Sequence, residues 1–290
     1  MWTQNSYEAS EQGKLFVVPT PIGNLQDITL RGLETLKTAD KILAEDTRNT
    51  KKLLNHFEIT TPLLSYHEHS DQKKIDQILA ALETGTTFAL VSDAGMPGIS
   101  DPGEVLIKQA IEREIDCIVL PGANAALVAL VGSGLPTKQF YFYGFLPRKN
   151  KDIKQAFEEI NKQTATILLY ESPYRLTDTL QAIKTHLGNR QVAVGRELTK
   201  RFEEFSRGMI DDVIHWSNSK EIKGECCIVI EGRTEALPDD NWWEDLSIKD
   251  HVDYYIIEGQ KSKDAIKQVA IDRKQPKRDI YQVYHVEETE

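Results

Sequence analysis

Residues 86–112 read TTFALVSDAGMPGISDPGEVLIKQAIE, and they hold a complete strand–loop–helix unit. TTFALV is an apolar run typical of a buried strand, whereas EVLIKQAIE repeats apolar residues at helical spacing. The loop between them, residues 92–103, contains three glycines, two prolines and two aspartates. Ser100 or Asp101 followed by Pro102 is typical of a helix start. Glycine-rich loops in this position often bind phosphate, but the two carboxylates disfavour a polyanion.

The same alternation of short apolar runs and amphipathic stretches fills the first 120 residues. It predicts strands at 15–18, 41–44, 62–65, 86–91 and 116–120, and helices at 29–39, 47–57, 71–83 and 101–114. Such alternation favours a parallel sheet covered by helices. Because ligands of these sheets bind outside the carboxyl ends of the strands, we expect the site in the loops there.

A second alternating stretch begins near residue 122. It predicts strands at 140–146, 164–171, 190–198, 201–208 and 224–232, helices at 151–162 and 174–188, and a buried or half-buried helix within 122–135. Successive strands at 190–208 without a helix between them indicate a mixed or antiparallel sheet. The expected fold class is therefore α/β, with two α/β domains and a small helical tail. The first domain has a mostly parallel sheet and the second a mixed sheet.

The expected domain boundaries follow these changes of pattern. They are a flexible N-terminus at 1–13, an N-terminal α/β domain at 14–122, a C-terminal α/β domain at 123–235, a linker at 236–246 and a tail at 247–290. Short amphipathic helices at 247–259, 262–274 and 276–286 resemble a helix-turn-helix module. Between residues 261 and 278 there are seven Lys or Arg against two Asp. This segment is either an ordinary solvated helix face or a nucleic-acid contact surface.

The composition is that of a globular protein with an acidic surface. Of 290 residues, 40% are hydrophobic and 28% are charged, and the formal net charge is −10. No stretch has the pattern of a signal peptide or of a membrane span, so we expect a cytoplasmic protein that does not bind membranes. The negative charge disfavours RNA binding over the whole surface. It is compatible with a specific RNA substrate that is held by local basic patches.

The cysteines do not indicate a disulfide framework or a metal centre. Cys226 and Cys227 are neighbours in an apolar run, where adjacent side chains point to opposite faces of a strand. With Cys117 they show no zinc spacing, so we interpret all of them as core thiols and predict no metal site.

Unusual loops follow most of the predicted strands, whereas motifs for nucleoside triphosphates, dinucleotides or a serine nucleophile are absent. We expect the loops at 19–27, 44–50, 92–103 and 121–126 to converge, with 170–175 and 196–201 facing them from the second domain. Their glycines and small residues allow close approach to a flat ligand. Their carboxylates suit ribose hydroxyls or a cation: Asp46, Asp93, Asp101, Glu171 and Glu197. S-adenosylmethionine, a cationic nucleoside without phosphate, fits this set.

Several of these loops also resemble a known family. PTPIGNL (19–25), DAGMPGISDPG (93–103), LPGANAAL (120–127), YESPYRL (170–176), GRELTK (195–200) and KGECCIVIEG (223–232) together resemble the ribosomal RNA small-subunit methyltransferase I family of the tetrapyrrole methylase superfamily. The resemblance spans about residues 15–232. Members often carry Pro-Ser or Pro-Cys at 123–124 and His at 174, where this chain has Ala123, Asn124 and Tyr174.

The resemblance implies a class III methyltransferase, a homodimer that binds S-adenosylmethionine between its domains. It implies methylation of the ribose 2′-oxygen of a cytidine at the decoding site of 16S rRNA, within the small ribosomal subunit. The implied cofactor-binding residues are Pro19, Pro21, Ile22, Gly23, Asp93, Ala94, Gly95, Met96, Ser100, Asp101, Pro121, Gly122, Ala123, Asn124, Ala125, Tyr170 and Glu171. A tetrapyrrole C-methyltransferase and a non-catalytic RNA-binding protein on the same fold are the alternatives.

Methyl transfer to a hydroxyl needs near-attack positioning and benefits from a base. Glu197 and Asp46 are the candidate bases; the alternative is that they cap helices or pair with Arg48 and Arg196. The candidates for holding RNA phosphates are Arg48, Arg148, Lys149, Lys200 and Arg201, each of which is otherwise a solvated surface charge.

Overall fold

The computed structural model describes residues 1–8, 11–68, 70–234 and 242–286 of the chain. It divides into two units, Met1–Gly232 and Arg233–Glu290. Residues 236–241 of the predicted linker, 287–290 of the predicted tail and 9–10 of the predicted flexible N-terminus lie outside the described residues. Within the N-terminal segment, the side-chain amide of Gln4 pairs with the backbone N–H and C=O of Cys117. No helix in the described ranges is both long and apolar enough to cross a membrane.

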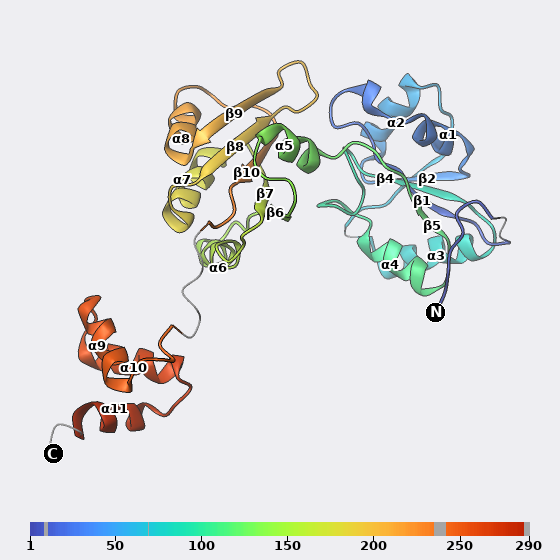
Figure 1. Cartoon of the computed structure of the whole chain (residues 1–290). Coiled ribbons are helices and arrows are strands. Elements are labelled where there is room, and N and C mark those ends of the chain that lie inside the picture. The colour runs from blue at the N-terminus through green and yellow to red at the C-terminus, as the bar shows by residue number, and fades with distance from the viewer. Residues whose placement is uncertain (9–10, 69, 235–241, 287–290) are drawn as a thin grey trace. The chain divides into compact units, whose positions relative to one another are not determined.

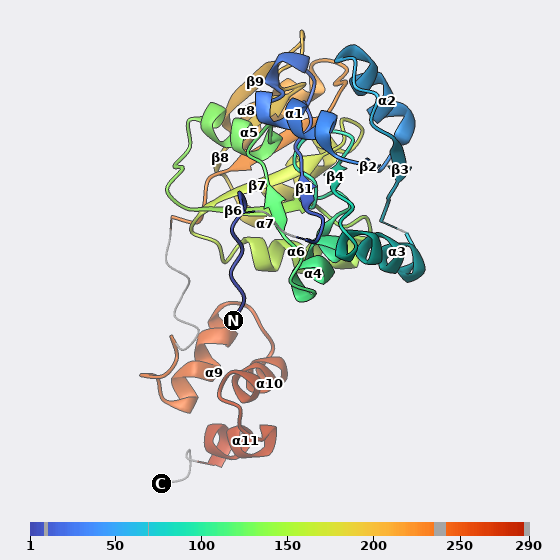
Figure 2. The ribbon, with the colours of Figure 1, turned by 90° about the vertical axis from the view of Figure 1, so that its right-hand side faces the viewer.

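The first sheet of Met1–Gly232 is parallel throughout and has the strand order β3-β2-β4-β1-β5 (Figure 1). Its strands are β1 (Leu15–Val17), β2 (Lys41–Ala44), β3 (Leu63–Ser65), β4 (Phe88–Val91) and β5 (Cys117–Val119). Its helices are η1 (Leu25–Asp27), α1 (Leu30–Thr38), α2 (Thr47–His56), α3 (Gln72–Glu83) and α4 (Glu104–Glu112). One apolar core lies under α1 and α2, and another lies under α3 and α4 on the opposite face (Figure 2). The predicted parallel, helix-covered sheet is confirmed.

Helix starts in this sheet follow local capping chemistry. Thr29, Asp46 and Asp71 accept hydrogen bonds from backbone N–H groups in the first turns of α1, α2 and α3. The predicted start of α4 at Ser100 or Asp101 is wrong, because Gly103 is the N-cap and has φ of 147°. The chain makes a further turn after Pro102 before the helix begins. The carboxyl group of Asp101 is therefore not used as a cap.

The strand order changes direction between β1 and β4. The chain leaves β1 through α1 towards β2, and it leaves β4 through α4 towards β5 on the other side. The loops after these two strands meet, because Thr20 and Gly95 exchange backbone hydrogen bonds of 2.9 and 3.0 Å. Crevices at such a switch point are where open α/β sheets bind ligands.

The second sheet is mixed and has the order β6-β7-β10-β8-β9. Its strands are β6 (Phe140–Phe145), β7 (Thr166–Glu171), β8 (Gln191–Arg196), β9 (Glu204–Met209) and β10 (Cys226–Ile230). Only the pairing of β6 with β7 is parallel within the described sheet, and the expected mixed sheet is confirmed.

Helices cover both faces of the second sheet. α6 (Asn150–Ile160), α7 (Leu176–Leu187) and α8 (Ile210–Asn218) pack on one face, and the apolar α5 (Ala125–Ser133) packs on the other. The sequence predicted α5, α6 and α7 but not α8. Cys226 and Cys227 are buried in the cores on opposite faces, as predicted for core thiols.

The unit Arg233–Glu290 contains α9 (Ile248–Ile257), α10 (Ser262–Asp272) and α11 (Lys277–Val286). The predicted short helices are thus confirmed. Val252, Ile266, Val269 and Ile280 form a small apolar core between them. His251 is fully buried beside the ring of Trp243, and burial lowers the pKa of its imidazole.

Candidate functional site

The loops at the carboxyl end of the first sheet are packed against one another through their glycines. A Cβ on Gly122 would lie 2.6 Å from the Cβ of Pro19, so the loop after β5 fits only with bare backbone there. Gly95 has φ of 85°, a left-handed conformation, and lies against Ile22. Asp93 accepts hydrogen bonds from the backbone N–H of Asp46 and from the side chain of Asn49. Loops after β1, β2, β4 and β5 therefore form one continuous surface.

A cavity of about 350 Å³ lies between these loops and the second sheet. We call it the inter-sheet cavity, and its volume is within the roughly 300–1,000 Å³ typical of ligand pockets. The predicted cofactor residues that line it are Ile22, Ala94, Ser100, Asp101, Ala125, Tyr170 and Glu171. Four of the six loops predicted to converge thus meet at a common hollow, whereas the loops at 44–50 and 196–201 contribute no residue to its lining.

The charged groups of the inter-sheet cavity are acidic. No Lys, Arg or His belongs to its lining in the described part of the chain, whereas Asp101, Glu171 and Glu225 do. Burial, together with the nearby carboxylates of Glu45 and Asp93, raises the pKa of Asp101 to about 6. Outside the lining, Arg175 lies 3.7 Å from Glu171 and Lys200 lies 3.0 Å from Glu225. The lining itself presents acceptors, which suit a hydroxylated or cationic ligand better than a phosphate.

Glu171 and Tyr170 are held by other groups of the protein. Glu171 is 3% exposed and accepts hydrogen bonds from the hydroxyl of Thr179 and the N–H of Ser172. The phenol oxygen of Tyr170 accepts a hydrogen bond from the N–H of Ala126, at the start of α5. These contacts fix the β7 wall of the inter-sheet cavity against α5 and α7.

Other predicted cofactor residues lie around the inter-sheet cavity but do not line it. Pro21, Gly23 and Asp93 line a second cavity beside α2. Met96 lines an apolar groove along α4. Asn124 caps α5 by accepting a hydrogen bond from the N–H of Leu127. The rest belong to the loop-to-loop packing or its flanks: Pro19, Gly95, Pro121, Gly122 and Ala123.

The candidate bases Asp46 and Glu197 lie outside the lining of the inter-sheet cavity. Asp46 is the N-cap of α2, and its hydrogen bonds with Arg48 lower its pKa to about 2. Glu197 has φ of 51° and accepts hydrogen bonds from Lys200 and from the N–H of Glu225. Burial opposes ionisation of Glu197, but these hydrogen bonds prevail and lower its pKa. Both carboxylates are therefore weak proton acceptors.

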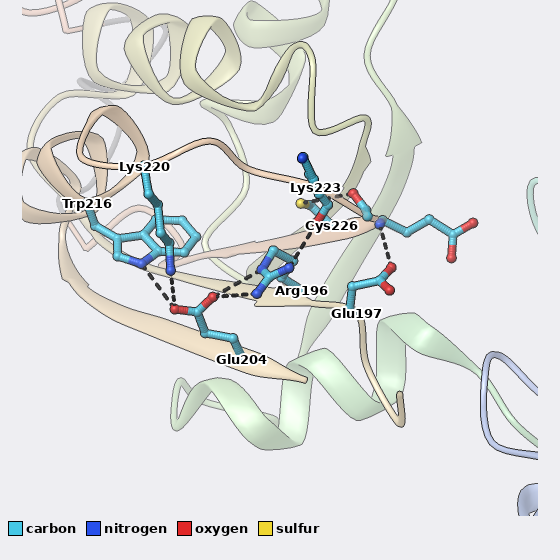
Figure 3. Close-up of polar contacts among 9 residues, drawn as sticks. Arg196, Glu197, Glu204, Trp216, Lys220, Lys223 and Cys226 are labelled. Carbon is cyan, nitrogen blue, oxygen red and sulfur yellow. Dashed lines mark hydrogen bonds and ion pairs between the residues drawn. The ribbon is translucent and has the colours of Figure 1, made fainter. Parts of the chain in front are cut away.

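Arg196 is not the partner of Glu197. Figure 3 shows its guanidinium bound to the carboxylate of Glu204, which also accepts hydrogen bonds from Trp216 and Lys220. The carboxylate of Glu197 points instead towards the strand that begins at Cys226 (Figure 3).

The candidate RNA-binding cations differ in their exposure and in whether they form ion pairs. Arg148, Lys149 and Arg201 are exposed, and Arg48 is exposed although it pairs with Asp46. Lys200 forms ion pairs with Glu197 and Glu225 at 2.8 and 3.0 Å. Lys200 also packs over Gly23, so it ties the loop after β8 to the loop after β1.

Sequence reasoning missed one wall of the inter-sheet cavity, formed by Phe145, Glu225, Cys226 and Cys227. Candidate sites were sought only after strands, which suits a parallel sheet. β10 runs antiparallel to β7, so its first residue, Cys226, pairs with Glu171 at the last residue of β7. The start of an antiparallel strand thus joins the site, and the predicted mixed sheet was the signal that could have revealed it.

Comparison with known proteins agrees with this geometry. Residues 14–214 match the family model described as Tetrapyrrole (Corrin/Porphyrin) Methylases. Ribosomal RNA small subunit methyltransferase I of Halalkalibacterium halodurans is 54% identical over 289 residues, 99% of this chain and 100% of that protein. The protein of the same name from Bacillus subtilis is 50% identical over 281 residues, 96% of each chain.

Solved structures share the fold at low sequence identity. Diphthine synthase superposes with a TM-score of 0.59 at 14% identity, over 77% of this chain and 92% of that one. A cobalt precorrin-4 methyltransferase superposes with a TM-score of 0.56 at 16% identity, over 75% and 94%. The chain belongs to the tetrapyrrole methylase family and, within it, to the ribosomal RNA small-subunit methyltransferase I family.

Proposed function

We propose that this protein transfers the methyl group of S-adenosylmethionine to the ribose 2′-oxygen of a cytidine at the decoding site of 16S rRNA. Its relatives are named as small-subunit rRNA methyltransferases, and it is an S-adenosylmethionine-dependent rRNA methyltransferase like them. The observation that carries the proposal is the inter-sheet cavity, which lies at the switch point of the first sheet and whose lining, among the residues that the structure describes, holds three carboxylates and no cation.

The residues of the inter-sheet cavity fit S-adenosylmethionine. Ile22, Phe145 and Tyr170 offer apolar and aromatic surface for a flat base, and Ala94 and Ala125 leave room for close approach. Asp101 and Glu225 supply acceptors for ribose hydroxyls or for the amino group of the cofactor. When bound, the cofactor supplies a methyl group on a positively charged sulfonium, and the neutral thioether is a good leaving group.

We assign proton acceptance to Asp101. Transfer of the cofactor's methyl group to a ribose hydroxyl would release the proton of that hydroxyl, and a residue of the cavity would accept it. A general base works best when its pKa is near the operating pH. Asp101 has a pKa of about 6 and lines the inter-sheet cavity, whereas Asp46 has a pKa of about 2 and does not.

RNA would be held by local basic groups, since the chain is acidic as a whole. Within the first unit, Arg148, Lys149 and Arg201 are exposed, and Arg48 is exposed while paired with Asp46. In the tail, the acidic Asp272 accepts hydrogen bonds from Tyr255 and Gln268 and so lies within the helices. The cations around it remain exposed: Lys261, Lys263, Lys267, Lys274, Lys277 and Arg278. Asp264 is also exposed among them, but the cations outnumber it. This excess of positive charge favours a nucleic-acid contact surface on the tail over an ordinary solvated face.

Assembly and location follow from the same proposal. We infer a homodimer, supported by the exposed apolar residues Val105, Ile111 and Val119 along α4 and the edge strand β5. A substrate within the small ribosomal subunit places the enzyme in the cytoplasm.

The test is transfer of labelled methyl from S-adenosylmethionine by the full-length protein. Small ribosomal subunits from a strain lacking the gene are expected to accept label at the ribose of one cytidine. Uroporphyrinogen III in parallel reactions is expected to accept none. Label on the tetrapyrrole but not on rRNA would support the alternative C-methyltransferase. If calorimetry detects no binding of S-adenosylmethionine, both methyltransferase hypotheses are wrong and the remaining hypothesis is a non-catalytic RNA-binding protein.

A further inference from the structure

A second cavity, of about 360 Å³, lies beside α2, and we call it the α2 cavity. Residues from the loop after β1, from α2 and from the end of β4 line it: Thr20, Pro21, Gly23, Leu25, Asn49, Thr50, Lys52, Leu53, His56, Ser92 and Asp93. Its volume is again in the range of ligand pockets.

The α2 cavity and the inter-sheet cavity share the same two loops. In the loop after β1, Pro21 and Gly23 line the α2 cavity, whereas Ile22 between them lines the inter-sheet cavity. In the loop after β4, Asp93 lines the α2 cavity and Ala94 lines the inter-sheet cavity. The two cavities therefore adjoin along one pair of loops. A base held in the α2 cavity would leave its ribose to reach past these loops to the cofactor, as the second substrate of a transfer reaction must.

Charge distinguishes the α2 cavity from its surroundings. The helix α2 reads TRNTKKLLNH and has no acidic residue, in a chain with a net charge of −10. Lys52 and His56 line the cavity and are exposed, and Lys52 forms no ion pair within the described chain. A third cavity on these loops is lined by Glu45, Glu68, Asp101 and Glu104 and would repel a phosphate. Of the α2 cavity and this third cavity, only the α2 cavity suits a nucleotide.

The α2 cavity also offers acceptors where the chain leaves β4. Asp93 has its two carboxylate oxygens held by the N–H of Asp46 and the side chain of Asn49, at 3.3 and 3.1 Å. Each carboxylate oxygen can accept more than one hydrogen bond. A carboxylate fixed in this way can accept from the exocyclic amine of cytosine, a group that uracil lacks.

We propose that the α2 cavity binds the target nucleotide of the RNA, with Lys52 against a phosphate and Asp93 accepting from the base amine. This assignment rests on the proposed function, because it takes the second substrate to be a cytidine in RNA. Under this assignment Asp93 contributes to specificity for cytosine and is no longer a cofactor-binding residue.

The test compares steady-state methylation of small ribosomal subunits by Lys52→Gln and by Lys73→Gln, a matched replacement of an exposed lysine on α3. Lys52→Gln is expected to raise KM for the subunits about tenfold, the size expected for one charged contact, with kcat and cofactor affinity nearly unchanged. Lys73→Gln is expected to leave all three unchanged. Equal KM values for the two variants and the wild type would overturn the phosphate assignment.

Base choice is tested with cytidine and uridine 5′-monophosphates added to the protein saturated with S-adenosylhomocysteine. Cytidine monophosphate is expected to shift the imidazole NMR signals of His56 at lower concentration than uridine monophosphate does, and Asp93→Asn is expected to remove the difference. His56 signals that do not move, or that respond equally to both nucleotides, would overturn the assignment. If the wild-type protein methylates rRNA but these variants and nucleotides behave otherwise than expected, only the nucleotide assignment is wrong. If the wild-type protein does not methylate rRNA, the proposed function is wrong.

Discussion

Asp101 is the residue on which the proposed chemistry depends. Its raised pKa means that the carboxylate accepts a proton only above a pH of about 6. We therefore expect kcat to fall as the pH is lowered through about 6 in the wild type. Asp101→Asn is expected to lose on the order of a hundredfold in kcat, as is usual for removal of a general base, and to lack this pH dependence. Single-turnover rates between pH 5 and 8.5 measure both effects.

Matched variants separate this role from a structural one. Asp46→Asn and Glu197→Gln are expected to keep the wild-type pH profile, because both carboxylates are already paired. The raised pKa also means that Asp101 destabilises the fold as the pH rises through about 6. Asp101→Asn should therefore melt at a higher temperature than wild type at pH 8 and at the same temperature at pH 4. A reduced rate in Glu197→Gln with Asp101→Asn unaffected would return the role to Glu197.

Residue types were easier to predict than residue roles. The carboxylates of the loops stand out in the sequence, and Asp101 was among them. Which carboxylate is buried and which is paired depends on neighbours from distant segments, such as Glu45 beside Asp101 and the N–H of Glu225 at Glu197. Spacing along the chain carries no information about those neighbours.

At the scale of elements, periodicity predicted most helices and strands, since amphipathic faces and buried runs reflect local packing. The misses have particular causes. The start of α4 moved to Gly103 because the chain turns once more after Pro102. The wall formed by the start of β10 was missed because strand direction depends on pairing, which the sequence of β10 does not encode locally.

The tail helices provide the test at this scale. If α10 and its flanking loop bind rRNA, Lys261→Gln, Lys263→Gln and Lys267→Gln together should weaken binding. The slope of log affinity against log salt should fall by about 0.7–0.9 for each phosphate that the triple variant no longer neutralises. Filter binding to small ribosomal subunits between 50 and 300 mM KCl measures the slope.

The control for the tail removes the same number of exposed lysines elsewhere. Lys37→Gln, Lys73→Gln and Lys108→Gln lie on α1, α3 and α4 and change the net charge equally. They should lower affinity less and leave the slope nearly unchanged. Equal slopes for both triple variants would mean that the tail contributes only its net charge.

At the scale of the whole molecule, strand–helix alternation was enough to predict an α/β fold with a parallel sheet followed by a mixed sheet. It could not predict how loops from both sheets divide the space between them. Consecutive residues such as Pro21 and Ile22 line different cavities, because the packing of Gly122 on Pro19 and of Gly95 on Ile22 sets the course of the backbone. That packing becomes visible only in three dimensions.

The central claim is that this protein is the enzyme that methylates a ribose in small-subunit rRNA. Nucleoside mass spectrometry of 16S rRNA from a strain without the gene tests it most directly. We predict that 2′-O-methylcytidine at one position of the decoding site disappears, that the wild-type gene restores it, and that the Asp101→Asn gene does not. An unchanged content of 2′-O-methylcytidine in the strain without the gene would contradict the claim.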